Sequence, residues 1–398
     1  MSAPRRGQAG PTLAEVLPRY GADYRATHEL SGVKAKVWRA IVDCRTAALG
    51  GHIETCDTCG TTRAVYHSCR NRHCPQCQTR AKQAWLAARR RELLPVPYFH
   101  LVFTLPHALN RLIALHPKVI YEMLFAAAST TLTDFAANPR WLGGVPSFTL
   151  VLHTWKQDLS RHVDVHALVA GGALTRNGEW CEAKRGFLFP VRALSTVYRA
   201  KFIDHLKQAW AKKRLPTNED ADSSSWPRLF EQLYQHDWVV YAKAPMGGPC
   251  QVLEYLARYT HRVAISNERI ISCDDGEVAF RVRKNTDDSR PRTIRLPAAT
   301  FIERFFLHVL PTGFKRIRHY GLLAPAHKAI QLGRAREALQ APTPDPVVVE
   351  SVEAFMRRTM QMDRWVCRHC ATGTVKVTSM LMPLRGGQST ACSVRAPP

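Results

Sequence analysis

Three side chains that can bind a metal ion alternate along one short segment of this chain. They are His162, Asp164 and His166, separated by single valines. Because successive side chains of a β-strand point to opposite faces, a strand here places all three on one face. Two imidazoles and a carboxylate suit Mg²⁺, Mn²⁺ or a similar divalent ion. An exposed polar strand face without a metal would show the same alternation, so this segment alone does not distinguish a metal site from a polar surface.

Two tyrosines farther along the chain suggest a nucleophile for such a metal site. Tyr255 and Tyr259 are four residues apart, so on a helix they lie one above the other. Arg258, His261 and Arg262 add positive charge and are candidate DNA contacts. Tyrosine pairs at this spacing also occur in packed cores. The pair therefore indicates catalysis only in combination with the metal-binding segment. Together they fit attack of tyrosine on a phosphodiester that a metal polarises, which leaves a phosphotyrosine.

A third motif has the spacing of a structural zinc site. Cys56 and Cys59 form one Cys-x-x-Cys pair, and Cys74 and Cys77 form another, with fourteen residues between the two pairs. Two such pairs close a tetrahedron of thiolates around zinc, so the sequence predicts these four cysteines as ligands of one Zn²⁺. A closed site leaves no position for a reacting water. We therefore interpret the module as a DNA-binding scaffold.

Other cysteines and histidines leave alternatives open. Four further side chains near the first motif could form a second zinc site or could simply pack around the first one: Cys44, His52, Cys69 and His73. A lone Cys-x-x-Cys at Cys367 and Cys370 has no evident partner pair, so we assign it no ligand role.

The overall charge indicates a polyanionic partner. The 398 residues contain 56 lysines and arginines against 32 acidic residues, which gives a net charge of +24 and a pI near 9.9. Such an excess usually binds nucleic acid. An anionic membrane is the alternative, but we find no convincing basic amphipathic helix and no apolar run long enough to span a bilayer. The N-terminus lacks the apolar core of a signal peptide, so we expect a cytoplasmic protein with no membrane association.

The pattern of hydrophobic residues predicts the elements that position these groups. A lead-in helix is expected within residues 1–40, a zinc module with a basic helix within 41–94, a mixed α/β region within 95–325, and a C-terminal helix with a partly disordered tail within 326–398. Strands are predicted at 99–105, 163–170 and 238–244, with a hairpin around 265–282 turning at Asp274–Gly276. Helices are predicted at 117–136, 192–213, 228–236, 250–261 and 298–307.

The sequence resembles a known family over roughly residues 30 to 325. Its segments CRTAALGGH (44–52), SCRNRHCPQCQ (68–78), FHLVFTLPHALN (99–110), HVDVHALVAGGAL (162–174), YLARYTHRVAISN (255–267) and FFLHVLPTGFKRIRHYG (305–321) carry the likeness. They are similar to the rolling-circle, two-tyrosine transposases of the insertion sequence 91 family.

The resemblance implies an α+β fold, with a small N-terminal zinc-binding module and a relaxase-like antiparallel sheet with flanking helices, of the HUH class, within residues 95–325. It implies Tyr255 and Tyr259 as nucleophiles, His166 as the second histidine of the metal pair, and Mg²⁺ or Mn²⁺ as cofactor beside structural Zn²⁺. The implied partners are single-stranded element ends and target DNA.

One residue departs from the family pattern. Asp164 stands where the first histidine of the pair is expected. A carboxylate still ligates Mg²⁺ or Mn²⁺, so the site is either retained with a changed metal preference or damaged. The third ligand is not identifiable from the sequence. Two rival functions follow: a replication initiator with the same nicking chemistry, and a zinc-ribbon DNA-binding protein without catalysis. The DNA ends, the target and the oligomeric state stay open.

Overall fold

The computed structural model describes residues 10–184, 186–215, 225–243, 251, 253–254, 264–282, 292–344, 350–361 and 363–384. The chain divides into two units, each built from separate stretches of sequence. The first unit comprises residues 1–83, 265–309 and 346–398, and the second comprises 84–264 and 310–345. This division differs from the consecutive domains that the sequence predicted, because strands far apart in the chain pair with each other.

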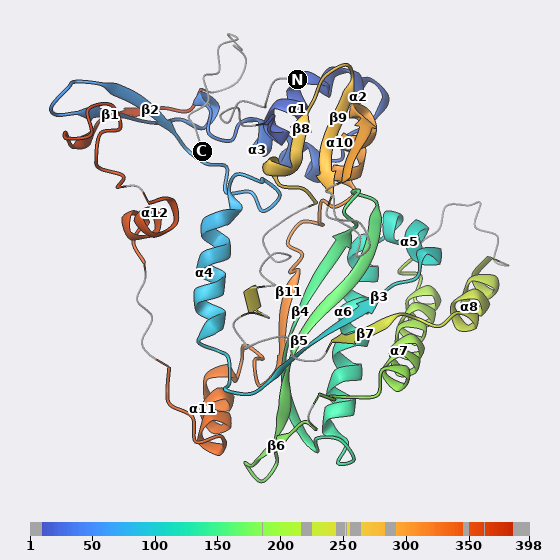
Figure 1. Cartoon of the computed structure of the whole chain (residues 1–398). Coiled ribbons are helices and arrows are strands. Elements are labelled where there is room, and N and C mark those ends of the chain that lie inside the picture. The colour runs from blue at the N-terminus through green and yellow to red at the C-terminus, as the bar shows by residue number, and fades with distance from the viewer. Residues whose placement is uncertain are drawn as a thin grey trace. The chain divides into compact units, whose positions relative to one another are not determined.

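An antiparallel sheet organises the second unit (Figure 1). Its strands follow the order β11-β4-β5-β3-β7, and β6 pairs with β5. The bounds are β3 Tyr98–Thr104, β4 Gly144–Trp155, β5 Arg161–Thr175, β6 Trp180–Glu182, β7 Val240–Lys243 and β11 Ile317–Gly321. The long central strands β4 and β5 are rich in valine and leucine, as expected of strands that are buried inside a sheet.

The helices of the second unit lie on the two faces of this sheet (Figure 1). Their bounds are α4 Gln78–Arg90 (which starts in the first unit), α5 Asn110–Leu115, α6 Pro117–Ala137, α7 Val191–Ala211, α8 Ser225–Gln235 and α11 Lys328–Ala338. Helices α6 and α7 cover one face and form the main core with apolar residues such as Val163 and Val165. On the opposite face, α4 and α11 pack near Leu168 and Ala170.

Alternation along β5 separates the two faces. Val163, Val165 and Ala167 belong to the main core, whereas Asp164 and His166 point the other way. The antiparallel register then fixes their neighbours on that second face, which we call the polar face. It is defined by residues opposite one another on four strands: His100 and Val102 of β3, Thr149, Val151 and His153 of β4, His162, Asp164, His166 and Leu168 of β5, and His319 of β11.

The first unit contains two smaller antiparallel sheets, β12-β1-β2 and β10-β9-β8. Its elements are α1 Leu13–Arg19, α2 Gly21–Thr27, α3 Gly32–Val42, β1 Gly51–Cys56, β2 Thr62–Tyr66, β8 Ile270–Ser272, β9 Glu277–Val282, β10 Arg292–Pro297, α10 Ala298–Phe306, α12 Val352–Met360 and β12 Val375–Leu381. Aromatic stacking of Trp38 on Phe306, with ring centroids 5.6 Å apart, joins α3 to α10.

The predicted hairpin at Asp274–Gly276 is confirmed. Strands β8 and β9 pair antiparallel across it. Asp275 and Gly276 have positive φ angles of 52° and 76°, the conformation that tight hairpin turns require and that favours glycine. Within the described residues, no helix combines the length and the hydrophobicity of a membrane span.

Candidate active site and cysteine clusters

Strand pairing between β4 and β5 brings three metal-binding groups together on the polar face. His153 lies directly opposite Asp164, and Val151 lies opposite His166. The Oδ1 atom of Asp164 is 3.3 Å from His153 Nδ1 and 3.2 Å from His166 Nε2. One ligand atom from each of these three residues lies within 4.8 Å of the other two. Such a convergence of two imidazoles and a carboxylate has the donor set of a divalent metal site.

The carboxylate at the centre of this group is deeply buried. Asp164 is only 5% exposed. Burial alone raises the pKa of a carboxyl group, but the charges and hydrogen bonds of His153 and His166 outweigh it and hold the pKa of Asp164 below its usual range. Asp164 is therefore an anion between two imidazoles, which is the state that binds a cation.

His100 lies behind His166 and fixes its orientation. His100 Nε2 is 2.9 Å from His166 Nδ1, and the two rings stack with centroids 5.1 Å apart. Burial, together with the neighbouring His166, lowers the pKa of His100 to about 4, so its ring is neutral near pH 7. The Nε2 atom of a neutral His100 can accept a hydrogen bond from the N–H group at His166 Nδ1, and in that tautomer His166 Nε2 carries the lone pair that a metal ion requires.

His162, which the sequence predicted as a ligand, occupies a different position. Its Nε2 atom is 3.4 Å from the other carboxylate oxygen of Asp164, Oδ2, and it does not belong to the three-residue group. The third member of the group is His153, a residue that the sequence analysis did not identify. The signal was hidden because residues 144–155 were not predicted as a strand.

A cationic side chain lies close to His153. The guanidinium of Arg316 is 5.7 Å from the centroid of the Trp155 ring, and the Trp155 and His153 rings are 4.3 Å apart. Arg316 is 7% exposed. Burial is the main reason why the pKa of His153 is lowered, and the charge of Arg316 lowers it further. The site thus combines two imidazoles, one carboxylate and a nearby positive charge.

The predicted nucleophiles lie outside the described residues. This applies to Tyr255 and Tyr259 and to the candidate DNA contacts Arg258, His261 and Arg262. The segment just before them is described: Leu253 is 2% exposed and packs in one cluster with Leu168 and Tyr98, and the Glu254 carboxylate binds Arg90 at 2.5 Å.

The cysteines form two clusters whose membership differs from the predicted one. The structure does not bring Cys56 and Cys59 together with Cys74 and Cys77. One cluster contains Cys44, Cys69, Cys74 and Cys77, and the other contains Cys56, Cys59, Cys367 and Cys370. Spacing alone defines a Cys-x-x-Cys pair but not its partner, and this is why the predicted grouping fails. Cys367 and Cys370, to which the sequence assigned no ligand role, thus lie in one cluster with Cys56 and Cys59.

The first cluster fits a structural zinc ion. Cys77 Sγ lies 3.4 Å from Cys44 Sγ and 3.6 Å from Cys69 Sγ. Sulfurs around a tetrahedral zinc, with Zn–S bonds of about 2.3 Å, are about 3.8 Å apart. The two histidines of the possible second zinc site are not in either cluster: His52 Nε2 is 3.1 Å from Glu54 Oε1, and His73 Nδ1 is 3.1 Å from Asn71 Oδ1.

Comparison with known proteins places this geometry in a family. Residues 16–105 match the family described as "Transposase zinc-binding domain", and residues 147–330 match the family described as "Putative transposase". The first match includes the cluster of Cys44, Cys69, Cys74 and Cys77 and thereby supports a structural zinc ion. The second includes His153, Asp164, His166 and the strands that carry them. The zinc-binding module and the sheet domain together define a DNA-processing transposase.

Two curated relatives extend the match over most of the chain. A "Putative transposase y4qJ" of Sinorhizobium fredii is 42% identical over 369 residues, which cover 91% of this chain and 93% of that protein. The "Transposase for insertion sequence element IS801" of Pseudomonas savastanoi pv. phaseolicola is 26% identical and covers 87% of this chain and 84% of its own length. The chain belongs to the transposases of the insertion sequence 91 family.

A search of solved structures finds a distant likeness. The conjugative relaxase TrwC, solved in complex with oriT DNA, aligns with 63% of this chain and 94% of its own. The identity is 11% and the TM-score is 0.24, which is too low to establish a common fold.

Proposed function

We propose that this transposase cuts and rejoins single DNA strands with Tyr255 and Tyr259 as nucleophiles and with a divalent metal held by His153, Asp164 and His166. The observation that carries the proposal is the convergence of the two imidazoles on Asp164 Oδ1, at 3.3 and 3.2 Å. Asp164 thus replaces a histidine without removing a ligand. This arrangement supports a retained metal site rather than a damaged one.

The donor set fits Mg²⁺ or Mn²⁺, and Mn²⁺ better, because it accepts imidazole as well as carboxylate ligands. A divalent ion bound there supplies Lewis-acid polarisation of a phosphoryl oxygen. His100 keeps His166 Nε2 directed toward the site through its contact with His166 Nδ1. Arg316 supplies positive charge next to His153, where it stabilises the charge that develops on the phosphoryl oxygens.

The position of Leu253 supports the tyrosines as the attacking groups. Leu253 packs against Leu168, which follows His166 by two residues and shares its face of β5. Leu253, two residues before Tyr255 in the sequence, is therefore buried on the side of the sheet that carries the polar face. The phenolic oxygen of a tyrosine attacks the scissile phosphorus and forms a phosphotyrosine with the 5′ end, while the other strand end leaves with a 3′ hydroxyl. Attack by a 3′ hydroxyl on the phosphotyrosine reverses the step and joins strands without an external energy source.

A covalent-adduct assay tests this proposal. Purified protein is incubated with a labelled single-stranded element end and Mg²⁺ or Mn²⁺, and adducts are resolved on a denaturing gel. We expect the wild type to form an adduct, the variant carrying Tyr255→Phe and Tyr259→Phe to lose it, and Tyr234→Phe to retain it, because Tyr234 is an exposed residue of α8. An adduct of undiminished yield in the double variant contradicts the assignment.

The same assay separates the rival functions. A replication initiator forms the adduct but does not join the strand to a target oligonucleotide, so joining in a donor–target reaction favours the transposase. A zinc-ribbon protein without catalysis binds the DNA and forms no adduct. If Asp164→His then gives an active enzyme, this chain is a transposase whose metal site has decayed.

A further inference from the structure

The Cys-x-x-Cys pair at Cys367 and Cys370 lies outside both segments that match the transposase families, which end at residues 105 and 330. In the structure this pair faces Cys56 and Cys59, more than 300 residues earlier in the chain. Cys56 Sγ is 3.7 Å from Cys370 Sγ, and Cys59 Sγ is 3.8 Å from Cys367 Sγ. These distances match the separation of about 3.8 Å around a tetrahedral zinc and far exceed a disulfide bond of about 2.05 Å.

The backbone around the four sulfurs is arranged to support thiolates. The amide of Cys59 donates to Cys56 Sγ at 3.5 Å, that of His369 to Cys367 Sγ at 3.4 Å, and that of Gly373 to Cys370 Sγ at 3.3 Å. Hydrogen bonds from N–H groups stabilise the anionic sulfur that a metal requires.

We call the segment that carries Cys56 and Cys59 the N-terminal arm, and the segment that carries Cys367 and Cys370 the C-terminal arm. The surroundings of Gly373 show how closely these two arms approach each other. A Cβ atom at this position would lie 2.3 Å from Cys56 Sγ, a distance that non-bonded atoms do not reach. Only glycine lets the backbone of the C-terminal arm lie against the sulfur. The backbone of the C-terminal arm therefore packs directly against the sulfur of Cys56.

Strand pairing holds the two arms in register. β12 pairs antiparallel with β1 from Gly51 opposite Leu381 to Cys56 opposite Val375. Just beyond, the Asp57 amide donates to the Thr374 carbonyl at 3.0 Å, and the Thr374 amide donates to Asp57 Oδ1 at 2.8 Å. The end of the paired region thus coincides with the cysteine cluster.

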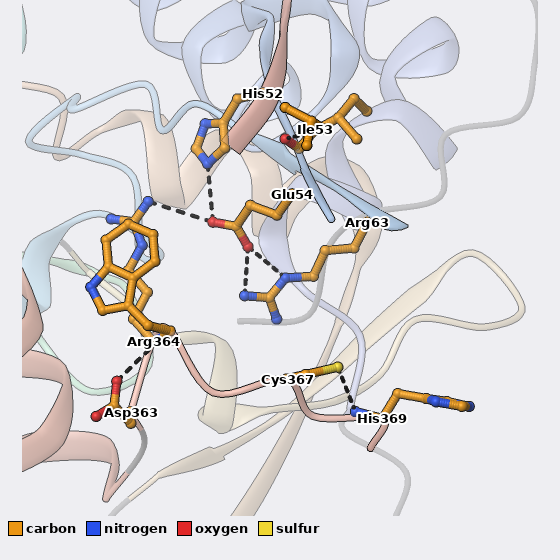
Figure 2. Close-up of polar contacts among 10 residues, drawn as sticks. His52, Ile53, Glu54, Arg63, Asp363, Arg364, Cys367 and His369 are labelled. Carbon is orange, nitrogen blue, oxygen red and sulfur yellow. Dashed lines mark hydrogen bonds and ion pairs between the residues drawn. The ribbon is translucent and has the colours of Figure 1, made fainter. Parts of the chain in front are cut away.

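A buried ion-pair cluster makes a second connection between the arms (Figure 2). Glu54 of β1 is 1% exposed and accepts hydrogen bonds from Arg63 at 2.7 Å and from His52 at 3.1 Å. Arg364, three residues before Cys367, lies 3.5 Å from the same carboxylate. Glu54 thus forms ion pairs both with Arg63 of the neighbouring strand β2 and with Arg364 of the C-terminal segment.

We propose that Cys56, Cys59, Cys367 and Cys370 hold a second structural zinc ion, separate from the ion of the cluster containing Cys44 and Cys77. Tetrahedral coordination by four thiolates is the preferred environment of zinc. This ion fastens the segment 363–381 to β1 and makes it part of the zinc-binding unit. The protein then carries two structural zinc ions, and the second requires both ends of the chain.

Metal counting on the full-length protein tests the proposal. Protein purified without chelators is analysed by inductively coupled plasma mass spectrometry. We expect two zinc ions per wild-type chain, one in the variant carrying Cys367→Ser and Cys370→Ser, and one in the variant carrying Cys69→Ser and Cys74→Ser. The matched control, Cys181→Ser, replaces a cysteine outside both clusters and retains two.

Two further measurements keep the result decisive. A His153→Ala, His166→Ala variant must still contain two zinc ions, which excludes adventitious zinc at the polar face as the second ion. Native mass spectrometry of the wild type counts bound metal even if a cysteine variant does not fold. A wild type with a single zinc ion, iron in place of the second zinc, or two zinc ions after loss of Cys367 and Cys370 overturns the proposal. None of these measurements depends on strand transfer. The second zinc site and the proposed function are therefore tested independently of each other.

Discussion

At the scale of single residues, the candidate active site shows how a substitution can be absorbed by its neighbours. The sequence placed Asp164 where a histidine is expected, and the structure surrounds it with His153 and His166. Electrostatic attraction and hydrogen bonding by these two rings hold the pKa of Asp164 below its usual range despite its burial. A carboxylate attracts a hard cation such as Mg²⁺ or Mn²⁺ more strongly than an imidazole does.

The division of roles between His153 and His162 gives a prediction at this scale. We expect His153→Ala to raise the Kd for Mn²⁺ by at least about tenfold, because it removes a ligand. His162→Ala is the matched control and should change the Kd by less than about threefold, because His162 Nε2 lies near Asp164 Oδ2 and not near the Oδ1 atom on which His153 and His166 converge. Isothermal titration with Mn²⁺, with the zinc sites left filled, measures both. Equal losses in the two variants, or a larger loss for His162→Ala, would contradict the assignment of His153.

At the scale of elements, local patterns predicted most of the helices and the strands β3, β5 and β7, but they missed the central strand β4. The helices predicted at 117–136, 192–213 and 298–307 are confirmed as α6, α7 and α10, because their periodicity is a local property. β4 was missed although Phe148, Leu150 and Leu152 alternate with Ser147, Thr149 and His153, a pattern that indicates a strand with one apolar and one more polar face. That omission also concealed His153. β12 was missed because it is defined by its pairing with β1, which no local pattern reports.

The cysteines show the same limit. Each Cys-x-x-Cys pair was recognisable from spacing, and the four-thiolate chemistry followed from it. Which pair closes with which is decided by long-range strand pairing and by the backbone near Gly373. The sequence therefore predicted the kind of site but not its membership.

His319 on β11 gives a prediction about pH. It lies opposite Thr149 of β4, with Nδ1 2.8 Å from Thr149 Oγ1 and Nε2 2.8 Å from an Arg89 nitrogen. Burial and the charge of Arg89 lower the pKa of His319 to about 4, from an ordinary value of 6.5. The unfolded chain thus binds a proton that the folded chain excludes between these two pH values, so stability is fully present above pH 6.5 and is lost as the pH falls toward 4.

Urea unfolding at pH 7 and pH 5 measures this loss. We expect the wild type to lose on the order of 1 to 2 kcal/mol more than His319→Gln between these pH values. His236→Gln, at an exposed position, serves as the control and should behave like the wild type. An identical pH dependence for wild type and His319→Gln would show that this ring is not held neutral.

At the scale of the whole molecule, charge and connectivity agree with the family assignment. The net charge of +24 suits a protein that must hold DNA, and the zinc-binding unit draws on both ends of the chain. Residues 265–309, which the sequence assigned to the catalytic region, join this unit as well. The strands that carry His153, Asp164 and His166 belong to the other unit.

The most direct test of the account identifies the amino acid that is joined to DNA. The covalent adduct formed with a single-stranded element end in Mn²⁺ is digested with nuclease and trypsin, and its peptides are sequenced by mass spectrometry. The account predicts a nucleotide attached through its 5′ phosphate to Tyr255 or Tyr259, and no adduct in Asp164→Ala or without divalent metal. A nucleotide on any other residue, or the same adduct in Asp164→Ala, would contradict it.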